Sequence, residues 1–96
     1  MAELLDDVAV ATALRDLDGW TGDATGITRT VEMASFPAVI AAVVEIAKVA
    51  EDMDHHPDID IRWRTLTLRC ATHSAGGVTD RDIALANRVD QIIAAA

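Results

Sequence analysis

The segment from residue 59 to residue 70 constrains the fold most, because apolar and polar residues alternate along it and the phase of the alternation changes once. The apolar residues are odd-numbered in its first half and even-numbered in its second half: Ile59, Ile61, Trp63, Leu66, Leu68 and Cys70. Since successive side chains of a strand point to opposite faces, one continuous strand would turn these residues to both faces. The phase change near Arg64 and Thr65 therefore predicts a tight turn between two antiparallel strands, with Trp63 and Cys70 in the core.

Two helices are expected in the first half of the chain. Apolar side chains recur at helical spacing in residues 4–17, and Asp18-Gly19 follows as a helix-ending pair. Ser35 suits an N-cap and Pro37 suits a first helical turn, so a second helix is expected to run from there to about Met53. The apolar stripe of this second helix is Val39, Val43, Ile46, Ala47 and Ala50.

The second helix is expected to stop near His55, because His56 precedes Pro57 and a residue before proline favours extended backbone. Thr79, with Asp82 three residues later, resembles a capping box and predicts the start of a last helix. The residues that this helix is expected to bury are Ile83, Ala86, Val89, Ile92 and Ile93.

Two more strands are expected ahead of the second helix, at residues 20–25 and 27–33, where apolar and polar residues alternate in the second of them. The order is then helix, two strands, helix, two strands, helix. This order predicts an α+β fold in which three helices pack on one face of a four-stranded antiparallel sheet. The open edges of so small a sheet favour pairing of subunits.

Composition limits the domain count and the classes of partner. The 96 residues suit one domain, spanning 1–96, and 51% apolar residues can form its core without disulfides. A net charge of −8 argues against direct binding to nucleic acids or to anionic membranes. The single cysteine, the absence of a basic and apolar leader in MAELLDDVAV, and Glu45 and Lys48 within the longest apolar stretch lead us to expect a cytoplasmic protein.

The histidines are the candidate chemical groups. His55 and His56 lie where the second helix meets a strand, and His73 follows the end of the hairpin. Because the strands of the hairpin run antiparallel, the start of one arm lies beside the end of the other, so His56 and His73 are expected to meet at one end of the sheet. Imidazoles suit proton transfer because they titrate near neutral pH.

Carboxylates accompany these histidines. Glu51 precedes His55 by four residues, the spacing at which helical side chains meet, and Asp54 adjoins His55. Asp82 lies shortly after His73 and is expected to act first of all as a helix cap. A carboxylate beside an imidazole orients the ring, so Glu51 is expected to support His55.

The spacing of these groups resembles a known family. Segment 51–57 (EDMDHHP), followed by Thr72-His73, Gly77 and segment 79–82 (TDRD), resembles the pterin-4a-carbinolamine dehydratase signature. Weaker similarity extends back over the second helix. The resemblance implies a four-stranded antiparallel sheet with three helices on one side, homodimers or homotetramers, and removal of water from 4a-hydroxytetrahydropterins without a metal or organic cofactor.

By position, the resemblance implies catalytic roles for His55, His56 and His73, with Glu51 and Asp82 in support. It also implies a set of residues that contact the pterin: Asp54, His55, His56, Ala71, Thr72, His73 and Ser74. We assign proton donation to the leaving hydroxyl and proton removal from N5 to His56 and His73, in either order. His55 is expected to orient the pterin or the other imidazoles, with help from Glu51.

Other interpretations stay open at this point. The histidine pair could be an exposed helix end, and three histidines could bind zinc. The chain could be a non-catalytic interaction module of the same fold. The sequence also departs from the family, because Ile59 and Ile61 stand where many members have aromatic residues, which bears on how a substrate ring would be stacked.

Overall fold

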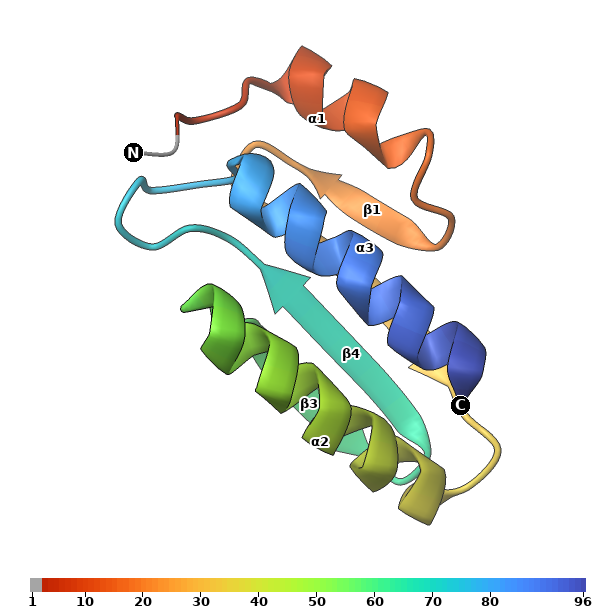
Figure 1. Cartoon of the computed structure of the whole chain (residues 1–96). Coiled ribbons are helices and arrows are strands. Elements are labelled where there is room, and N and C mark those ends of the chain that lie inside the picture. The colour runs from red at the N-terminus through yellow and green to blue at the C-terminus, as the bar shows by residue number, and fades with distance from the viewer. Residues whose placement is uncertain (1–2) are drawn as a thin grey trace.

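The computed structural model describes residues 3–96, so the first two residues of the predicted domain lie outside the described part. Within that part, three helices and four strands follow the order α1 (Asp7–Leu14), β1 (Trp20–Asp23), β2 (Gly26–Glu32), α2 (Phe36–Met53), β3 (Asp58–Arg62), β4 (Thr65–Cys70) and α3 (Asp80–Ala95). The strands form one antiparallel sheet in the order β1-β2-β4-β3. The helices lie together on one side of it (Figure 1), so the predicted α+β fold is confirmed.

The predicted hairpin is also confirmed. β3 and β4 pair antiparallel from Asp58 opposite Arg69 to Arg62 opposite Thr65, which leaves Trp63 and Arg64 as a two-residue turn. The change of phase therefore lies where the sequence pattern indicates it. The hairpin brings the start of β3 beside the end of β4, and this end of the sheet carries the candidate site.

Trp63 is not a core residue, contrary to the sequence interpretation. Its side chain is 71% exposed, and its backbone has a positive φ of 53°. Trp63 belongs to the turn, so the alternation of faces that buries residues along a strand no longer applies to it. Its ring instead packs against Arg64, whose guanidinium carbon lies 4.8 Å from the ring centroid.

The first helix is shorter than expected at both ends. Asp6 caps α1 by accepting a hydrogen bond from the backbone N–H of Ala9 at 2.8 Å, so Leu4 precedes the helix and pairs instead with Thr79. Leu17 follows the helix, yet its side chain is buried. α2 begins as predicted, with Ser35 as its N-cap and proline in its first turn. Among the described residues, no helix has both the length and the apolar character needed to cross a membrane.

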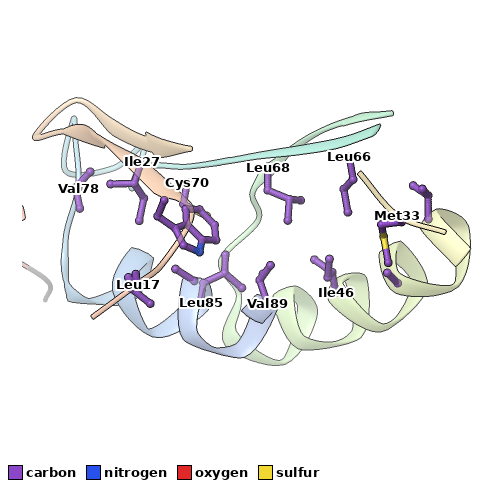
Figure 2. Close-up of a cluster of buried hydrophobic side chains, with 14 of the residues drawn as sticks. Leu17, Ile27, Met33, Ile46, Leu66, Leu68, Cys70, Val78, Leu85 and Val89 are labelled. Carbon is purple, nitrogen blue, oxygen red and sulfur yellow. The ribbon is translucent and has the colours of Figure 1, made fainter. Parts of the chain in front are cut away.

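The core lies between the sheet and the helices (Figure 2). Leu66 and Leu68 of β4 face Ile46 of α2 and Val89 of α3 across it. Two details differ from the sequence prediction: Ala47 is exposed, and three isoleucines of α3 are only partly buried. The residues that α2 and α3 bury most deeply are Val39, Ala42, Ile46, Ala50, Asp82, Leu85, Ala86 and Val89.

Candidate active site

The candidate site is a cleft of about 390 Å³ at one end of the sheet. Figure 1 shows that the C-terminal ends of α2 and β4 and the N-terminal end of α3 all point to this end of the molecule. The residues that line the cleft are Asp54, His55, His56, Pro57, Asp58, Ala71, Thr72, His73, Ser74 and Arg81. All three histidines thus face one cleft, as the hairpin geometry predicts, together with the other four residues of the expected contact set.

The end of α2 separates the two neighbouring histidines. Asp54 is the C-cap and adopts the left-handed conformation, with φ 49° and ψ 47°. The backbone N–H of His55 donates to the carbonyl of Ala50 at 3.0 Å, which closes the last turn of the helix. After this reversal the imidazole of His55 is buried, whereas that of His56 is exposed.

His55 belongs to a buried polar network. Its Nε2 lies 2.5 Å from Oδ1 of Asp82, whose side chain is fully buried. The other carboxylate oxygen of Asp82 accepts from the hydroxyl of Thr72 at 2.8 Å and from the backbone N–H of Thr79 at 2.9 Å. A buried carboxylate is tolerated only when such donors satisfy it.

The same network connects the helix cap to the histidine. Thr79 and Asp82 form the predicted capping box at the start of α3. The hydroxyl of Thr72 lies 2.7 Å from that of Thr79, and because Thr72 donates its only proton to Asp82, it accepts from Thr79. The carboxylate of Asp82 therefore both caps α3 and binds His55, whereas the sequence pattern indicated mainly the cap.

Glu51 supports His56 and not His55, which corrects the sequence prediction. Oε1 of Glu51 lies 2.6 Å from Nε2 of His56, and both side chains are largely exposed. The expected contact used the spacing of residues within a helix, but α2 ends at Met53, before His55. Because the chain reverses at Asp54, His55 turns inward to α3, and His56 becomes the neighbour of Glu51.

His73 lies in a tight loop beyond β4. The backbone N–H of Thr72 donates to the carbonyl of Gly77 at 2.8 Å, and that of Gly76 donates to the carbonyl of His73 at 3.2 Å. Gly77 must lack a side chain, because a Cβ there would lie 2.5 Å from the carbonyl oxygen of Ala24. The loop holds His73 exposed at the cleft, and its ring has no hydrogen bond to another residue within 3–96.

Three lining residues were absent from the expected contact set: Pro57, Asp58 and Arg81. Pro57 and Arg81 lie inside the motif segments, so their sequence position was the available signal. The guanidinium of Arg81 donates to the carbonyls of Met53 and Asp54, and the second distance is 3.0 Å. Nothing local in the sequence indicates this contact with α2.

Cys70 is buried beside the site and is not a candidate nucleophile. Burial, together with the nearby charges of Asp82 and Asp58, raises the pKa of its thiol to about 12. Because the thiolate is the reactive form of cysteine, this thiol is inert near neutral pH. The interpretation of Cys70 as a small buried apolar residue is confirmed.

The geometry offers acid–base groups and no assembled metal cage. Within residues 3–96, no three His, Cys, Asp or Glu side chains are arranged to hold one metal ion. The cleft instead combines one buried imidazole–carboxylate pair, one exposed pair and a third exposed imidazole. Such a set can donate a proton at one point of a small molecule and accept one at another.

Comparison with known proteins places this arrangement in a family. The chain matches the family model described as "Pterin 4 alpha carbinolamine dehydratase" over residues 3–92. A relative from Nocardia farcinica is 57% identical over 90 residues, which cover 94% of this chain and 95% of the relative. A relative from Roseiflexus castenholzii is 50% identical over 93 residues, which cover 97% and 100%. Both provisionally carry the name pterin-4-alpha-carbinolamine dehydratase.

Solved structures agree with the sequence relatives. The crystal structure of a transcriptional coactivator/pterin dehydratase from Brucella melitensis matches with a TM-score of 0.89 at 33% identity, over 93% of this chain and 97% of that one. A pterin dehydratase-like RuBisCO assembly factor of the alpha-carboxysome shares the fold, with a TM-score of 0.63 at 19% identity over 77% and 86% of the two chains. The match to the family model over nearly the whole chain, together with these identities, shows that this protein belongs to the pterin 4 alpha carbinolamine dehydratase family.

Proposed function

We propose that the protein removes water from a 4a-hydroxytetrahydropterin and releases the quinonoid dihydropterin, by acid–base catalysis from its histidines. The observation that carries the proposal is the convergence of His55, His56 and His73 on one cleft. Membership of the family supports a dehydratase in general terms. The cleft volume of about 390 Å³ falls within the range of roughly 300–1,000 Å³ that small-molecule sites occupy.

The reaction needs two proton transfers at neighbouring atoms of the pterin. The C4a–O bond breaks as one imidazole protonates the departing hydroxyl, which leaves as water. A second imidazole takes the proton from N5, and the electron pair of the N5–H bond forms the C4a=N5 double bond. Protons and electrons balance without a redox partner, and the proposed mechanism assigns both proton transfers to imidazoles.

Burial supports a division of roles among the three imidazoles. His55 is held by a buried carboxylate, which suits an orienting group that binds the pterin in one geometry. His56 and His73 are exposed, so they can exchange protons with solvent between turnovers. We assign them as the donor and acceptor, and Glu51 orients His56.

Stopped-flow dehydration of a 4a-hydroxytetrahydropterin tests the proposal. We expect His56→Ala and His73→Ala each to lower kcat by about a hundredfold to ten-thousandfold, the range typical of general acid–base groups. Lys48→Ala is the matched control, because among residues 3–96 the ammonium of Lys48 forms only an exposed pair with Glu45 on α2. A wild-type rate equal to the buffer rate would exclude the enzyme. Stoichiometric zinc, with loss of activity on chelation, would favour a metal enzyme instead.

An exposed apolar row on α2 favours a second role, in association with other protein chains. Three large apolar side chains of α2, Phe36, Ile40 and Val44, recur at a spacing of four residues and are exposed. Such a row suits association with another helix. One similar solved protein is named a transcriptional coactivator as well as a pterin dehydratase. We propose that this row joins subunits into a homodimer or homotetramer, and that it can serve an interaction role.

Sedimentation equilibrium tests this second role. Ile40→Glu is expected to shift the protein toward smaller species, and Glu45→Gln on the same helix is the control. An unchanged mass for the Ile40 variant would remove the surface from consideration. Retained dehydratase activity in the smaller species would show that the two roles are separable.

A further inference from the structure

We propose that Arg81 is a positioning residue for the His55–His56 segment, an inference that rests on the proposed dehydratase function for its catalytic consequence. Arg81 lies in the first turn of α3, beside Asp82. Its guanidinium reaches across to α2 and donates to the carbonyls of Met53 and Asp54. These two residues immediately precede the histidine pair.

The contact satisfies groups that a helix end leaves without partners. The last carbonyls of an α-helix have no intrahelical donor. At the end of α2, the backbone N–H groups of Asp54 and His55 close back onto the carbonyls of Glu51 and Ala50, at 3.1 and 3.0 Å. Arg81 supplies a donor for the carbonyls of Met53 and Asp54, which lie further along the same turn.

The partial charges at the helix ends also favour the contact between Arg81 and α2. The C-terminal end of a helix carries partial negative charge and favours a cation, but the last turn of α2 contains no basic residue. Arg81 lies at the N-terminal end of its own helix, where a cation is locally unfavourable and where Asp80 and Asp82 are favourable. Its position is therefore explained by α2 and not by α3.

Arg81 and Asp82 together hold the same segment twice. Arg81 holds the main chain at residues 53–54, and Asp82 holds the imidazole of His55 at 2.5 Å. The first turn of α3 thus determines where His55 and His56 lie in the cleft. Small displacements of positioned groups can cost on the order of a hundredfold in rate.

Amide hydrogen exchange in the ligand-free protein tests the structural half of the inference. In Arg81→Met, which keeps the side-chain bulk without donors or charge, we expect the amides of Asp54 and His55 to exchange about tenfold faster or more through local opening. Leu68 in the middle of β4 should keep its exchange rate. Arg88→Met, elsewhere on α3, is the matched control, because Arg88 is exposed and makes no ion pair within the described residues.

Kinetics test the catalytic half. We expect kcat of Arg81→Met to fall on the order of tenfold to a hundredfold with little change in KM, and Arg81→Lys to recover part of the loss. A rise in KM at unchanged kcat would overturn the inference, because it would mean that Arg81 binds the substrate. Wild-type exchange and kcat in Arg81→Met would also overturn it.

Two further outcomes distinguish a failure of this inference from a failure to fold or a failure of the proposed function. If Arg81→Met does not fold, Arg81→Lys decides: faster exchange confined to Asp54 and His55 supports positioning, whereas unchanged or uniformly faster exchange contradicts it. If the wild-type protein dehydrates no pterin, the proposed function fails, but the exchange of the two amides still decides whether Arg81 holds this segment.

Discussion

The cleft contains two imidazole–carboxylate pairs that are alike in chemistry and opposite in environment. His55 and Asp82 lie 2.5 Å apart with side chains 7% and 0% exposed, whereas His56 and Glu51 lie 2.6 Å apart with side chains 56% and 78% exposed. Distance therefore does not distinguish them. In the buried pair water cannot replace a lost partner, but in the exposed pair it can.

The two adjacent histidines, His55 and His56, therefore have different roles. The buried pair is tied to a helix cap and to Thr72, so it acts as part of the framework. The exposed pair has one contact and is free to rearrange around a substrate. We call the buried pair with Thr72 the framework side, and the exposed pair of His56 and Glu51 the adjustable side. Four predictions test this distinction.

The largest effect is expected at Asp82. Asp82→Ala should lower the free energy of unfolding by about 3–5 kcal/mol, because it removes one partner of a buried pair and leaves several donors unsatisfied. Urea denaturation followed by circular dichroism measures the change. Glu51→Ala should alter it by no more than about 1 kcal/mol. Equal losses for the two variants would contradict the distinction between the pairs.

Thr72 extends the framework side, so its hydroxyl should matter more than its shape. Thr72→Val keeps the volume but removes the donor to Asp82, and hydrogen bonds to charged groups contribute about 1.5–3 kcal/mol. The same unfolding assay measures the loss. Thr67→Val serves as the control, because within the described residues the hydroxyl of Thr67 bonds only to that of Thr30, on the exposed face of the sheet, at 3.0 Å. A control loss as large as that of Thr72→Val would argue against a buried network.

Cys70 lets pH probe the framework side. Its pKa is raised from 9.0 to about 12 by burial, so the folded thiol stays neutral while the unfolded thiol ionises above pH 9. The unfolded chain then binds fewer protons, and stability, which is fully present below pH 9, should fall by up to about 1.4 kcal/mol per pH unit between roughly pH 9 and pH 12. The chain has no tyrosine to obscure this trend.

Unfolding curves at several pH values measure the slope of this trend. Cys70→Val should flatten it, since the titrating group is gone. An equally steep slope in that variant would place the alkaline transition elsewhere in the molecule.

The smallest effect is expected for the coupling between His56 and Glu51. A double-mutant cycle with His56→Ala and Glu51→Ala should give an interaction of roughly 0–1 kcal/mol in stability, as for other exposed ion pairs, and added salt should weaken it. Coupling of several kcal/mol, insensitive to salt, would show that this pair also belongs to the framework.

Short-range patterns carried most of the fold prediction. The phase change between Ile61 and Leu66 located the hairpin, and Ser35 and Thr79 located two helix starts, because alternation and capping depend on residues only a few positions apart. The same local logic failed at Trp63, where the turn interrupts the alternation that would bury a strand residue.

By itself, the sequence determined the order of elements, the sheet-end position of the histidines and the motif that links them to a family. The tertiary structure alone decided their partners, because the left-handed turn at Asp54 sends His55 inward to Asp82 and leaves Glu51 to His56. It also brought Arg81 onto the end of α2. The contacts of Asp82 and Arg81 connect the start of α3 to the end of α2. Packing of these two helices creates them, so no local spacing encodes them.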